Sequence, residues 1–543
     1  MHITKVHIEN FKCFKGSFRF KINEGINLFV GNNEAGKSSI IEAIHLALTG
    51  LFNGKYLRNE LTQYVFNNEV VSEYISKLEA VTGIPIPPHI LIEIFIEGDD
   101  LAELEGINNS ERVKAQGIIL KVAFDAKYQG EYEKLVKAGG IKTLPIEYYN
   151  ISWSTFAQDD SVTPKTIPLK SALIDSSSNR YQNGSDIYIS RIVKELLDED
   201  EIVEISQAHR KMKETFMDEP SIKKINTKIQ DAAKISDKKV ELSVELSSKN
   251  AWESSLMTYI DNVPFHFIGK GEQSIVKTKL ALAHKKAKEA NLILLEEPEN
   301  HLSHTKLNQL ISYLNGDSQG KQIIISTHSS FVANKLGLGN LILLHEQKTI
   351  RLNDLKPETK QFFAKLSGYD TLRLILCERV ILVEGDSDEL VIQRAYLNER
   401  GKLPIEDGTD IISVGTSFLR FLEIAEKLKK RIAIATDNDG NIEAIKKKYS
   451  DYLEENAKDY IKICYDETID EGDVEGFNYN TLEPKLLKEN GLEKMNAILG
   501  TSLTSEDDLR DFMKSNKTSC ALKIFDCTTE ITFPKYLIDA INH

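Results

Sequence analysis

A phosphate-binding loop near the N-terminus constrains this chain more than any other feature. Residues 31–38 read GNNEAGKS and fit the pattern GxxxxGK[ST], between an apolar strand at 26–31 and a helical pattern at 37–49. Glycine-rich backbone amides can cradle phosphates, Lys37 can reach the β- and γ-phosphates, and Ser38 can bind Mg²⁺. The loop therefore predicts ATP binding, with contacts from Asn32, Asn33, Gly36, Lys37, Ser38 and Ser39.

A second acidic motif lies far downstream of this loop. The apolar run 292–295 reads LILL and predicts a buried strand, which ends in Glu296 and Glu297. This arrangement is typical of a Walker B motif. Glu296 takes the place of the Mg²⁺-associated carboxylate, and Glu297 takes that of the general base for the attacking water.

Two further motifs indicate an ABC-type ATPase. The sequence GKGEQ at 269–273, followed by a helical pattern, occupies the place of the ABC signature, so Gly271 and Gln273 are predicted to contact nucleotide at a helix N-terminus. The apolar strand 323–327 ends in His328, which resembles the switch histidine that senses the γ-phosphate. The order of signature, Walker B and histidine is that of an ABC head.

The opening of the chain adds to this resemblance. Residues 8–14 read IENFKCF and resemble the start of RecF-like and SMC-like heads, with lysine in place of arginine. Such heads bind ATP between the loop of one protomer and the signature of another. The resemblance therefore implies a homodimer or a higher homo-oligomer.

The C-terminal part carries a second set of acids at strand ends. The strand RVILV at 379–383 leads into Glu384 and Gly385, with Asp388 one helical turn further on. The strand at 432–436 leads into Asp437 and Asp439, which would point to the same side if the backbone were extended. Gathered carboxylates repel one another and require divalent metals, which can promote phosphodiester hydrolysis. These two motifs resemble those of a Toprim domain.

The flanking sequence makes the resemblance more specific. The run YDTLRLILCERVILVEG at 369–385 looks like the entry to the Toprim domain of OLD (overcoming lysogenization defect) proteins, and NTLEP at 480–484 resembles their late acidic motif. The resemblance implies that Glu483, or more weakly Glu475, completes the metal cluster. Residues 516–522 resemble the family's lysine motif, which implies that Lys517 stabilises charge on the cleaved phosphate.

The pattern of elements predicts an α/β chain with an ABC/SMC-like ATPase head, a helical dimerisation insertion and a C-terminal Toprim α/β domain. The insertion is rich in Lys, Glu, Asp and Ser, and a merely solvated helical arm is the alternative. The predicted division is 1–194 for the N-terminal lobe of the head, 195–260 for the insertion, 261–346 for the C-terminal lobe, 347–375 for a linker and 376–543 for the Toprim domain.

Net charge and cysteine usage limit the kinds of nucleic-acid site and of cellular compartment that fit this chain. The net charge of −14 is unlike that of a simple DNA coat, so a nucleic-acid site must be a local basic groove or use metals to bridge acids to phosphate. The five cysteines form no CxxC pair, which argues against a disulfide framework and for a reducing cytoplasm. No apolar run is long enough for a membrane span, and no signal peptide is expected.

Three functions remain to be compared. The first is an ATP-controlled, metal-dependent DNA endonuclease or nickase using ATP and Mg²⁺, with Mn²⁺ or Ca²⁺ as options at the Toprim site. The resemblance implies phage defence of the Gabija or retron-linked kind, with a possible partner protein or retron component. The second is an SMC/RecF-like DNA clamp or repair protein without nuclease activity. The third is a topoisomerase or primase. A type IIA topoisomerase needs a domain with a tyrosine nucleophile outside the Toprim domain, a primase needs a zinc or polymerase module, and the sequence shows neither. The acid cluster favours the first.

Overall fold

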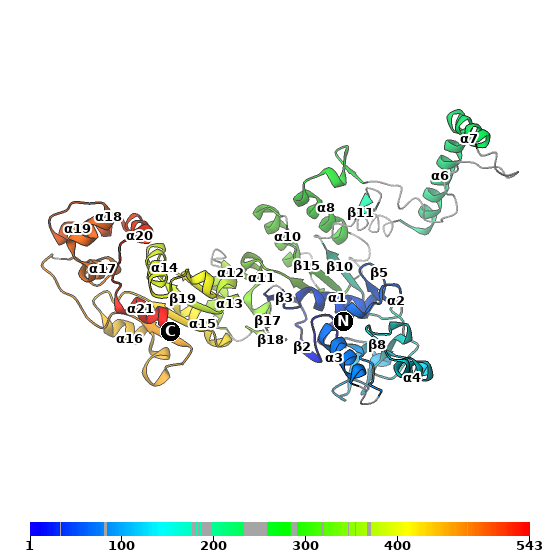
Figure 1. Cartoon of the computed structure of the whole chain (residues 1–543), viewed down its shortest axis with the longest axis horizontal. Coiled ribbons are helices and arrows are strands. Elements are labelled where there is room, and N and C mark those ends of the chain that lie inside the picture. Colours follow the sequence, from blue (N-terminus) through cyan, green and yellow to red (C-terminus); the bar gives the residue numbers. More distant parts are fainter. Residues whose placement is uncertain are drawn as a thin grey trace. The chain divides into compact units, whose positions relative to one another are not determined.

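The structure is a computed structural model, and it describes most of the chain. The described residues are 1–32, 34–80, 84–175, 181–182, 185–186, 197–232, 258–283, 290–300, 302–316, 320–345, 347–352, 355–365, 371–474 and 476–543. They form two compact units (Figure 1). Unit 1 holds 1–327 and 342–349, and unit 2 holds 328–341 and 350–543.

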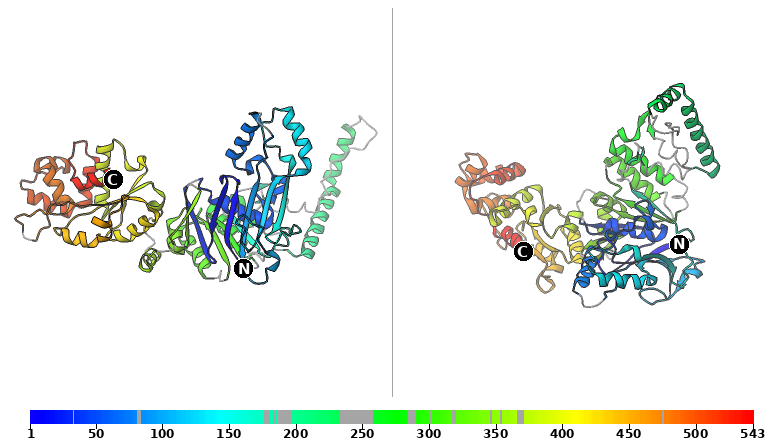
Figure 2. Two further views of the ribbon diagram at one scale, coloured as in Figure 1. Left: turned by 90° about the horizontal axis from the view of Figure 1, so that it is seen from below. Right: turned by 45° about the vertical axis from the view of Figure 1, so that its right-hand side comes forward.

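An antiparallel sheet forms one layer of unit 1. Its strand order is β2-β1-β6-β8-β7, with β9 paired to β8, and its long strands lie side by side in Figure 2. Alternating apolar residues face the core, as in the pattern of Val6 and Ile8. The strands are β1 (His2–Glu9), β2 (Ser17–Lys21), β6 (Ile90–Glu97), β7 (Glu105–Gly106), β8 (Ala115–Phe124) and β9 (Tyr149–Thr155).

A second sheet carries the ATPase motifs. Its order is β10-β15-β16-β3-β17-β18, and the first four strands are parallel. The central strands are continuous apolar runs, as expected for a sheet covered on both faces. The strands are β10 (Ser171–Asp175), β15 (Leu292–Glu296), β16 (Gln322–Ser326), β3 (Ile26–Gly31), β17 (Leu341–His345) and β18 (Lys348–Arg351).

Helix α1 (Lys37–Thr49) lies between the two sheets. It contacts strands of both, and apolar residues on nearly all of its sides are buried, including Ile40, Ala43 and Ile44. A helix that is apolar all round is typical of such a buried position. Because α1 starts at the phosphate-binding loop, the loop is anchored on the core of unit 1.

Shorter elements complete unit 1. They are β4 (Leu51–Phe52), β5 (Lys55–Tyr56), α2 (Leu57–Glu60), α3 (Asn68–Glu79), α4 (Gln129–Ala138), β11 (Tyr181–Gln182), β12 (Ser185–Asp186), α6 (Glu199–Asp218), α7 (Pro220–Ala232), β13 (Tyr259–Ile260), β14 (Val263–Pro264), α8 (Lys270–Ala283) and α10 (His304–Gly316). Helices α6 and α7 occupy the predicted insertion, and residues 233–257 of it lie outside the described residues. Its dimerisation role stays a prediction.

Much of the predicted linker at 347–375 has regular secondary structure. Strand β18 extends the second sheet, and α12 (Pro357–Lys365) and α13 (Thr371–Leu376) follow it. The side chains of Leu352, Leu355 and Phe363 are buried. Buried apolar residues need a core to pack against, so most of this segment is part of the folded units.

Unit 2 is built on a four-stranded parallel sheet of order β20-β19-β21-β22. The strands are β19 (Arg379–Val383), β20 (Thr409–Ser413), β21 (Arg431–Ala435) and β22 (Ile461–Cys464). Apolar residues of β19 and β21 share a core with α14, α17 and α21. The helices are α11 (Ser330–Leu336), α12, α13, α14 (Asp386–Arg400), α15 (Phe418–Leu428), α16 (Ile442–Lys448), α17 (Leu482–Asn490), α18 (Leu492–Leu499), α19 (Glu506–Ser515), α20 (Lys517–Asp526) and α21 (Lys535–Asn542).

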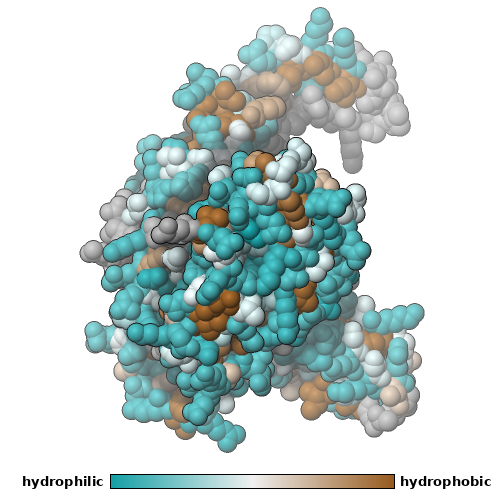
Figure 3. All heavy atoms as spheres, turned by 90° about the vertical axis from the view of Figure 1, so that its left-hand side faces the viewer, coloured by the Kyte–Doolittle hydropathy of each residue, from teal (hydrophilic) through white to brown (hydrophobic). Residues whose placement is uncertain are grey.

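The side chains that face the viewer in Figure 3 are mostly hydrophilic, with hydrophobic ones in small separate patches. Among the described helices, none is both long and apolar enough to cross a membrane.

Candidate functional site

The phosphate-binding loop is closely packed at its glycines. Gly36 has a φ of 99°, and a Cβ there would lie 2.7 Å from the ring of Phe14. A Cβ on Gly31 would lie 2.8 Å from the carbonyl oxygen of Leu344. Both positions therefore exclude a side chain. Without side chains at these two positions, the backbone amides of the loop are left accessible to a phosphate.

Lys37 lies over this loop. Its Nζ donates to the carbonyl oxygens of Gly31 and Asn32, both at 3.0 Å. Ser38 and Ser39 are half-buried in the first turn of α1, and Asn32 is exposed. The predicted contact Asn33 lies outside the described residues.

The Walker B acids lie at the end of β15, in the same unit. Glu296 is paired in register with Ser326 on β16. Glu297 has a φ of 40°, its amide donates to the Ser326 carbonyl at 3.0 Å, and its carboxylate accepts from Asn300 at 2.6 Å. The positive φ, which is uncommon for a residue other than glycine, marks a turn directly after the strand.

The charge of Lys37 in the phosphate-binding loop interacts with the charges of nearby acids. Burial lowers the pKa of Lys37, and the negative charges of Glu297 and Glu299 oppose that shift. Both carboxylates therefore lie near the lysine ammonium. Glu299 was not predicted from the sequence; it accepts a 2.7 Å hydrogen bond from the hydroxyl of Thr327.

The signature residues lie at the start of α8, with Gly271 half-buried in its first turn. The side-chain amide of Gln273 is buried and donates to the carbonyls of Phe265 and Ile268, at 2.9 and 2.8 Å. The side-chain amide hydrogens of Gln273 therefore hold the preceding turn, and its contact with nucleotide stays a prediction. The predicted switch residue His328 is exposed and is the first residue of unit 2.

In unit 2, parallel strands bring the predicted acids to one edge of the sheet. Glu384 follows β19 and is exposed, Asp388 lies in the first turn of α14, and Asp437 comes two residues after β21. The carboxylate of Asp388 accepts from the amide of Gly385 at 2.8 Å. Because β19 and β21 are neighbours, these acids lie at adjoining strand ends.

The charges of these acids interact. Burial raises the pKa of Asp388 to about 6, and the nearby carboxylates of Glu483 and Glu384 also raise it. Loss of hydration raises the pKa of Asp437 well above its usual range, as do Asp388 and Glu483. Crowded carboxylates of this kind are typical of a site that binds cations.

Glu483 and Lys517 complete this group from two distant helices. Glu483 is only 6% exposed at the start of α17, and Lys517 opens α20. The lysine Nζ lies 3.1 Å from Glu483 Oε1. Partial burial lowers the pKa of Lys517, but the carboxylates, Glu483 first, outweigh this and raise it.

Asp439 departs from the predicted extended backbone. Its φ is 46°, so it lies in a left-handed turn, is exposed, and accepts a 2.9 Å hydrogen bond from Asn478. The neighbouring Asn438 is buried and donates to the carbonyls of Asp466 and Thr468. The second half of this motif therefore holds the loop that precedes α17. Glu475, also in that loop, lies outside the described residues.

Among the described residues, no three His, Cys, Asp or Glu side chains are arranged to hold a metal ion as they stand. The chemistry of the group nevertheless fits one. Glu384, Asp388, Asp437 and Glu483 supply the oxygen ligands that Mg²⁺ and Mn²⁺ prefer. Their mutual repulsion is what such a cation would relieve.

Two side chains that the sequence analysis missed support this group. The hydroxyl of the buried Tyr536 on α21 donates to Asp437 Oδ1 at 3.2 Å. Lys485 is buried two residues after Glu483, and its Nζ lies 2.7 Å from Asp466 and 2.8 Å from Asp470. No short motif marks either residue.

We expect Lys485→Met to destabilise unit 2 by about 1–3 kcal/mol, because it leaves two partly buried carboxylates without the buried lysine that pairs with both of them. The matched change Lys488→Met removes a half-exposed lysine that pairs with Asp470 alone, and it should cost about 0–1 kcal/mol. Thermal and urea unfolding of the two variants measures the difference. Equal losses of unfolding free energy in the two variants would show that burial of Lys485 does not make its ion pairs more important for stability.

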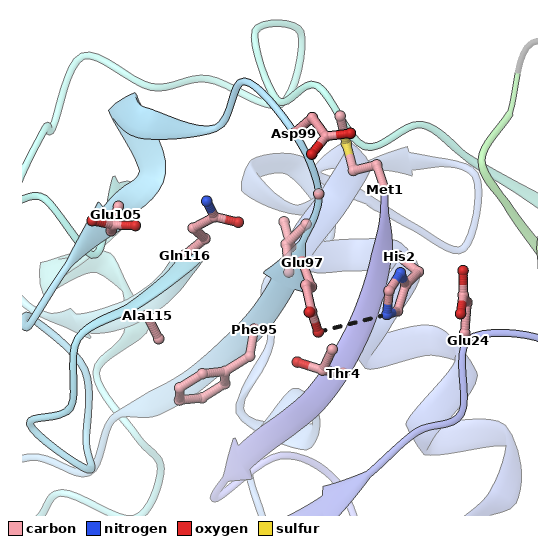
Figure 4. A pocket seen from close by; sticks show the side chains of 12 residues that line it. Met1, His2, Thr4, Glu24, Phe95, Glu97, Asp99, Glu105, Ala115 and Gln116 are labelled. Atoms are coloured by element: carbon pink, nitrogen blue, oxygen red, sulfur yellow. Dashed lines mark ion pairs between the residues drawn. The ribbon is translucent and has the colours of Figure 1, made fainter.

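A separate cavity in unit 1 contains none of the predicted site residues. It measures 640 Å³, and several carboxylates surround it, with His2 Nε2 3.9 Å from Glu97 (Figure 4). It is lined by Met1, His2, Thr4, Glu24, Phe95, Ile96, Glu97, Gly98, Asp99, Glu105, Ala115 and Gln116. It therefore belongs to neither candidate site.

Family models match three parts of the chain. Residues 1–131 match an AAA ATPase domain, and residues 218–334 match an AAA domain whose description refers to the AbiEii toxin of a type IV TA system. Residues 375–439 match the Toprim domain of overcoming lysogenization defect protein-like proteins. The last match covers Glu384, Asp388, Asp437 and Asp439.

Curated relatives are DNA replication and repair proteins RecF. The protein of Clostridium botulinum (strain Loch Maree / Type A3) is 30% identical over 197 residues, which are 36% of this chain and 51% of the relative. That of Clostridium tetani (strain Massachusetts / E88) is 25% identical over 124 residues, 23% of this chain and 32% of the relative. The chain thus spans about half or less of these relatives.

Two of the solved structures that match the chain do so with low TM-scores. The structure of the recombination mediator protein RecF-ATPrS in the RecFOR pathway has a TM-score of 0.33 at 11% identity, and covers 65% of this chain and 98% of its own. The SMC head domain from Thermotoga maritima has a TM-score of 0.27 at 14% identity, and the match covers 63% of this chain and 94% of that domain.

The chain therefore joins AAA ATPase domains to an OLD-like Toprim domain, the combination of an OLD-family ATPase plus Toprim. This combination implies the use of a nucleotide and a divalent metal. It suggests an ATP-dependent nuclease.

Proposed function

We propose, from the ATPase and Toprim domains that this one chain joins, that the protein is an ATP-controlled, divalent-metal-dependent DNA endonuclease or nickase. The observation that carries the proposal is the crowding of Asp388, Asp437 and Glu483 around one lysine, Lys517. A protein that only binds DNA gains nothing from gathering repelling carboxylates in a half-buried site.

Within this site each side chain has a distinct role. Asp388, Asp437 and Glu483 would hold the divalent cation together with Glu384, which as an exposed carboxylate can also accept or donate a proton. A bound Mg²⁺ would supply charge neutralisation and an activated water. Lys517 lies where its ammonium can stabilise charge that develops on the cleaved phosphate. The role of Asp439 as a ligand has less support, because Asp439 lies in a turn that contacts Asn478.

The ATPase half would supply control. Lys37, Ser38 and Glu296 would hold ATP and its Mg²⁺, and Glu297 would orient the attacking water as general base. His328 and the α8 N-terminus with Gly271 are assigned to γ-phosphate contacts. In ABC-type heads the signature of one protomer faces the phosphate-binding loop of another, so we assign a homodimer or higher homo-oligomer.

The setting of this activity is a further part of the proposal. The resemblance to OLD-family nucleases favours phage defence, with a partner protein or a retron component as an associated factor. All five cysteines are free thiols, which favours a reducing cytoplasm.

The second candidate is an ATP-dependent DNA clamp or repair protein, as the RecF relatives would favour. The matches cover 32% and 51% of the length of those two relatives. In this reading the Toprim domain binds nucleic acid without cutting it. The acid cluster distinguishes the two candidates, because a clamp does not require it.

Cleavage of supercoiled plasmid tests the proposal. With Mg²⁺ or Mn²⁺, with and without ATP, the wild-type chain should produce nicked or linear DNA, and Glu384→Ala should not. Asp386→Asn is the matched control, since it removes an exposed acid two residues away on α14. No cleavage by the wild type, with ATP hydrolysis intact, would favour the clamp. Equal cleavage by wild type and Glu384→Ala would overturn the site assignment.

A further inference from the structure

A second group of side chains lies beside Glu384, on the side of β20. The carbonyl oxygen of Glu384 accepts from the amide of Gly415 at 3.0 Å and from the hydroxyl of Ser413 at 3.2 Å. The loop after β20 is thereby tied to the first Toprim motif. This loop leads directly into α15, whose first turn begins at Phe418.

The N-terminus of α15 lacks a side-chain cap. Ser417 is its N-cap residue, and its side chain makes no capping hydrogen bond. The helix is 11 residues long, so its amide groups and its dipole present partial positive charge at this end. The preceding Thr416 is exposed, which leaves the loop open to a ligand.

A buried hydroxyl without a partner points to the same place. Tyr449 is 1% exposed, and within the described part of the chain its hydroxyl has no hydrogen-bond partner. Burial raises the pKa of Tyr449, and the nearby negative charge of Glu384 adds to this effect. A buried hydroxyl without a partner is costly, and such groups often mark a ligand position.

A lysine is held against the same aromatic rings. The Nζ of Lys448 lies 5.1 Å from the ring centroid of Tyr449 and 5.3 Å from that of Phe418. It therefore lies between the end of α16 and the start of α15. Lys446 and Lys447 are exposed just before it, so positive charge extends along α16 beyond what one phosphate needs.

We propose that Tyr449, Lys448 and the N-terminus of α15 form a phosphate subsite that holds the nucleic-acid strand next to the scissile position at Glu384. The inference deepens the proposed nuclease function and rests on it. The hydroxyl, the ammonium and the helix amides are all donors, which suits a phosphodiester oxygen. The extension of charge along α16 favours a polymeric strand over a free nucleotide.

DNA binding by the full chain tests the subsite. The Kd of a short labelled oligonucleotide would be measured by anisotropy, with Ca²⁺ in place of Mg²⁺ to slow cleavage. Tyr449→Phe keeps the ring and removes only the hydroxyl, and it should raise the Kd about 10-fold, the effect of a lost charge-assisted hydrogen bond. Lys448→Gln should raise the Kd similarly and reduce the salt slope by about 1.

Two matched controls separate this effect from general damage. Tyr452→Phe removes a buried hydroxyl that pairs with Glu426, and Lys427→Gln removes a charge at the opposite end of α15; both should bind DNA as the wild type does. If Tyr449→Phe and Lys448→Gln also bind and cut normally, the subsite is overturned while the nuclease proposal stands. If the controls lose as much affinity as these two variants, the binding is diffuse and the subsite is likewise overturned. A wild type that neither binds nor cuts DNA would overturn both.

Discussion

Asp437→Asn is expected to reduce DNA cleavage by about 10²–10³-fold, the loss typical of one essential electrostatic group in a transition state. The same change should stabilise the metal-free protein. Asp437 receives hydrogen bonds from the Leu482 amide and from Tyr536, and Asn can keep one of them through its single carbonyl oxygen. What the variant loses is the negative charge that Asp388 and Glu483 repel.

The pH dependence of this stabilisation follows from the direction of the pKa shift. The pKa of Asp437 in the folded chain is well above its value in the unfolded chain, so the folded chain binds the extra proton between those two values. Wild-type stability therefore falls as pH rises from about 4 through the folded pKa. The Asn variant avoids this loss. Its advantage should be present at neutral pH and should vanish near pH 4.

Thermal unfolding in EDTA at several pH values, beside plasmid cleavage at neutral pH, measures both effects. Added Mg²⁺ should raise the melting temperature of the wild type more than that of the variant, because the charge that binds the cation is reduced. Asp386→Asn, which lies outside the cluster, should change neither property. A variant that still cuts DNA would exclude Asp437 from the site, and an unchanged melting temperature would show that the crowding carries no energetic cost.

The parts of the site that lie at strand ends were accessible from the sequence. An apolar run followed by an acid predicts a buried strand with a carboxylate at its carboxyl end, and parallel neighbours bring such ends together. Glu384 and Asp437 follow this rule, as does Glu296 in the ATPase sheet. The strands themselves were predicted by the same runs.

Long-range contacts were not accessible in this way. Tyr536 reaches Asp437 across 99 residues, and Lys485 binds a loop that has no motif. Local conformation can also override a pattern, as at Asp439, where a positive φ redirects the side chain. Gln273 matches the signature in position, yet its side-chain amide donates hydrogen bonds to two carbonyls of the preceding turn. A motif fixes residue types at a spacing, whereas tertiary packing decides what each side chain contacts.

Glu297→Gln is expected to reduce ATP hydrolysis by about 10²–10⁴-fold, the contribution of a general base, with little change in nucleotide affinity. Glu297 lies near Lys37 and its carboxylate is already oriented by Asn300, so Gln can keep the hydrogen bond but cannot accept a proton. Glu299→Gln is the matched control. Glu299 also lies near Lys37, but its Oε1 is bonded to Thr327, and the change should have a much smaller effect on turnover.

Nucleotide binding and phosphate release, measured on the same variants, separate the roles. Lys37→Ala should lose both binding and hydrolysis, whereas Glu297→Gln should bind ATP and hold it. Plasmid cleavage by Glu297→Gln in ATP then reports the sign of the control: sustained cutting means that bound ATP opens the Toprim site to DNA, and suppressed cutting means that hydrolysis must occur first. If Glu299→Gln stops hydrolysis while Glu297→Gln does not, the general base is Glu299, which was not predicted from the sequence.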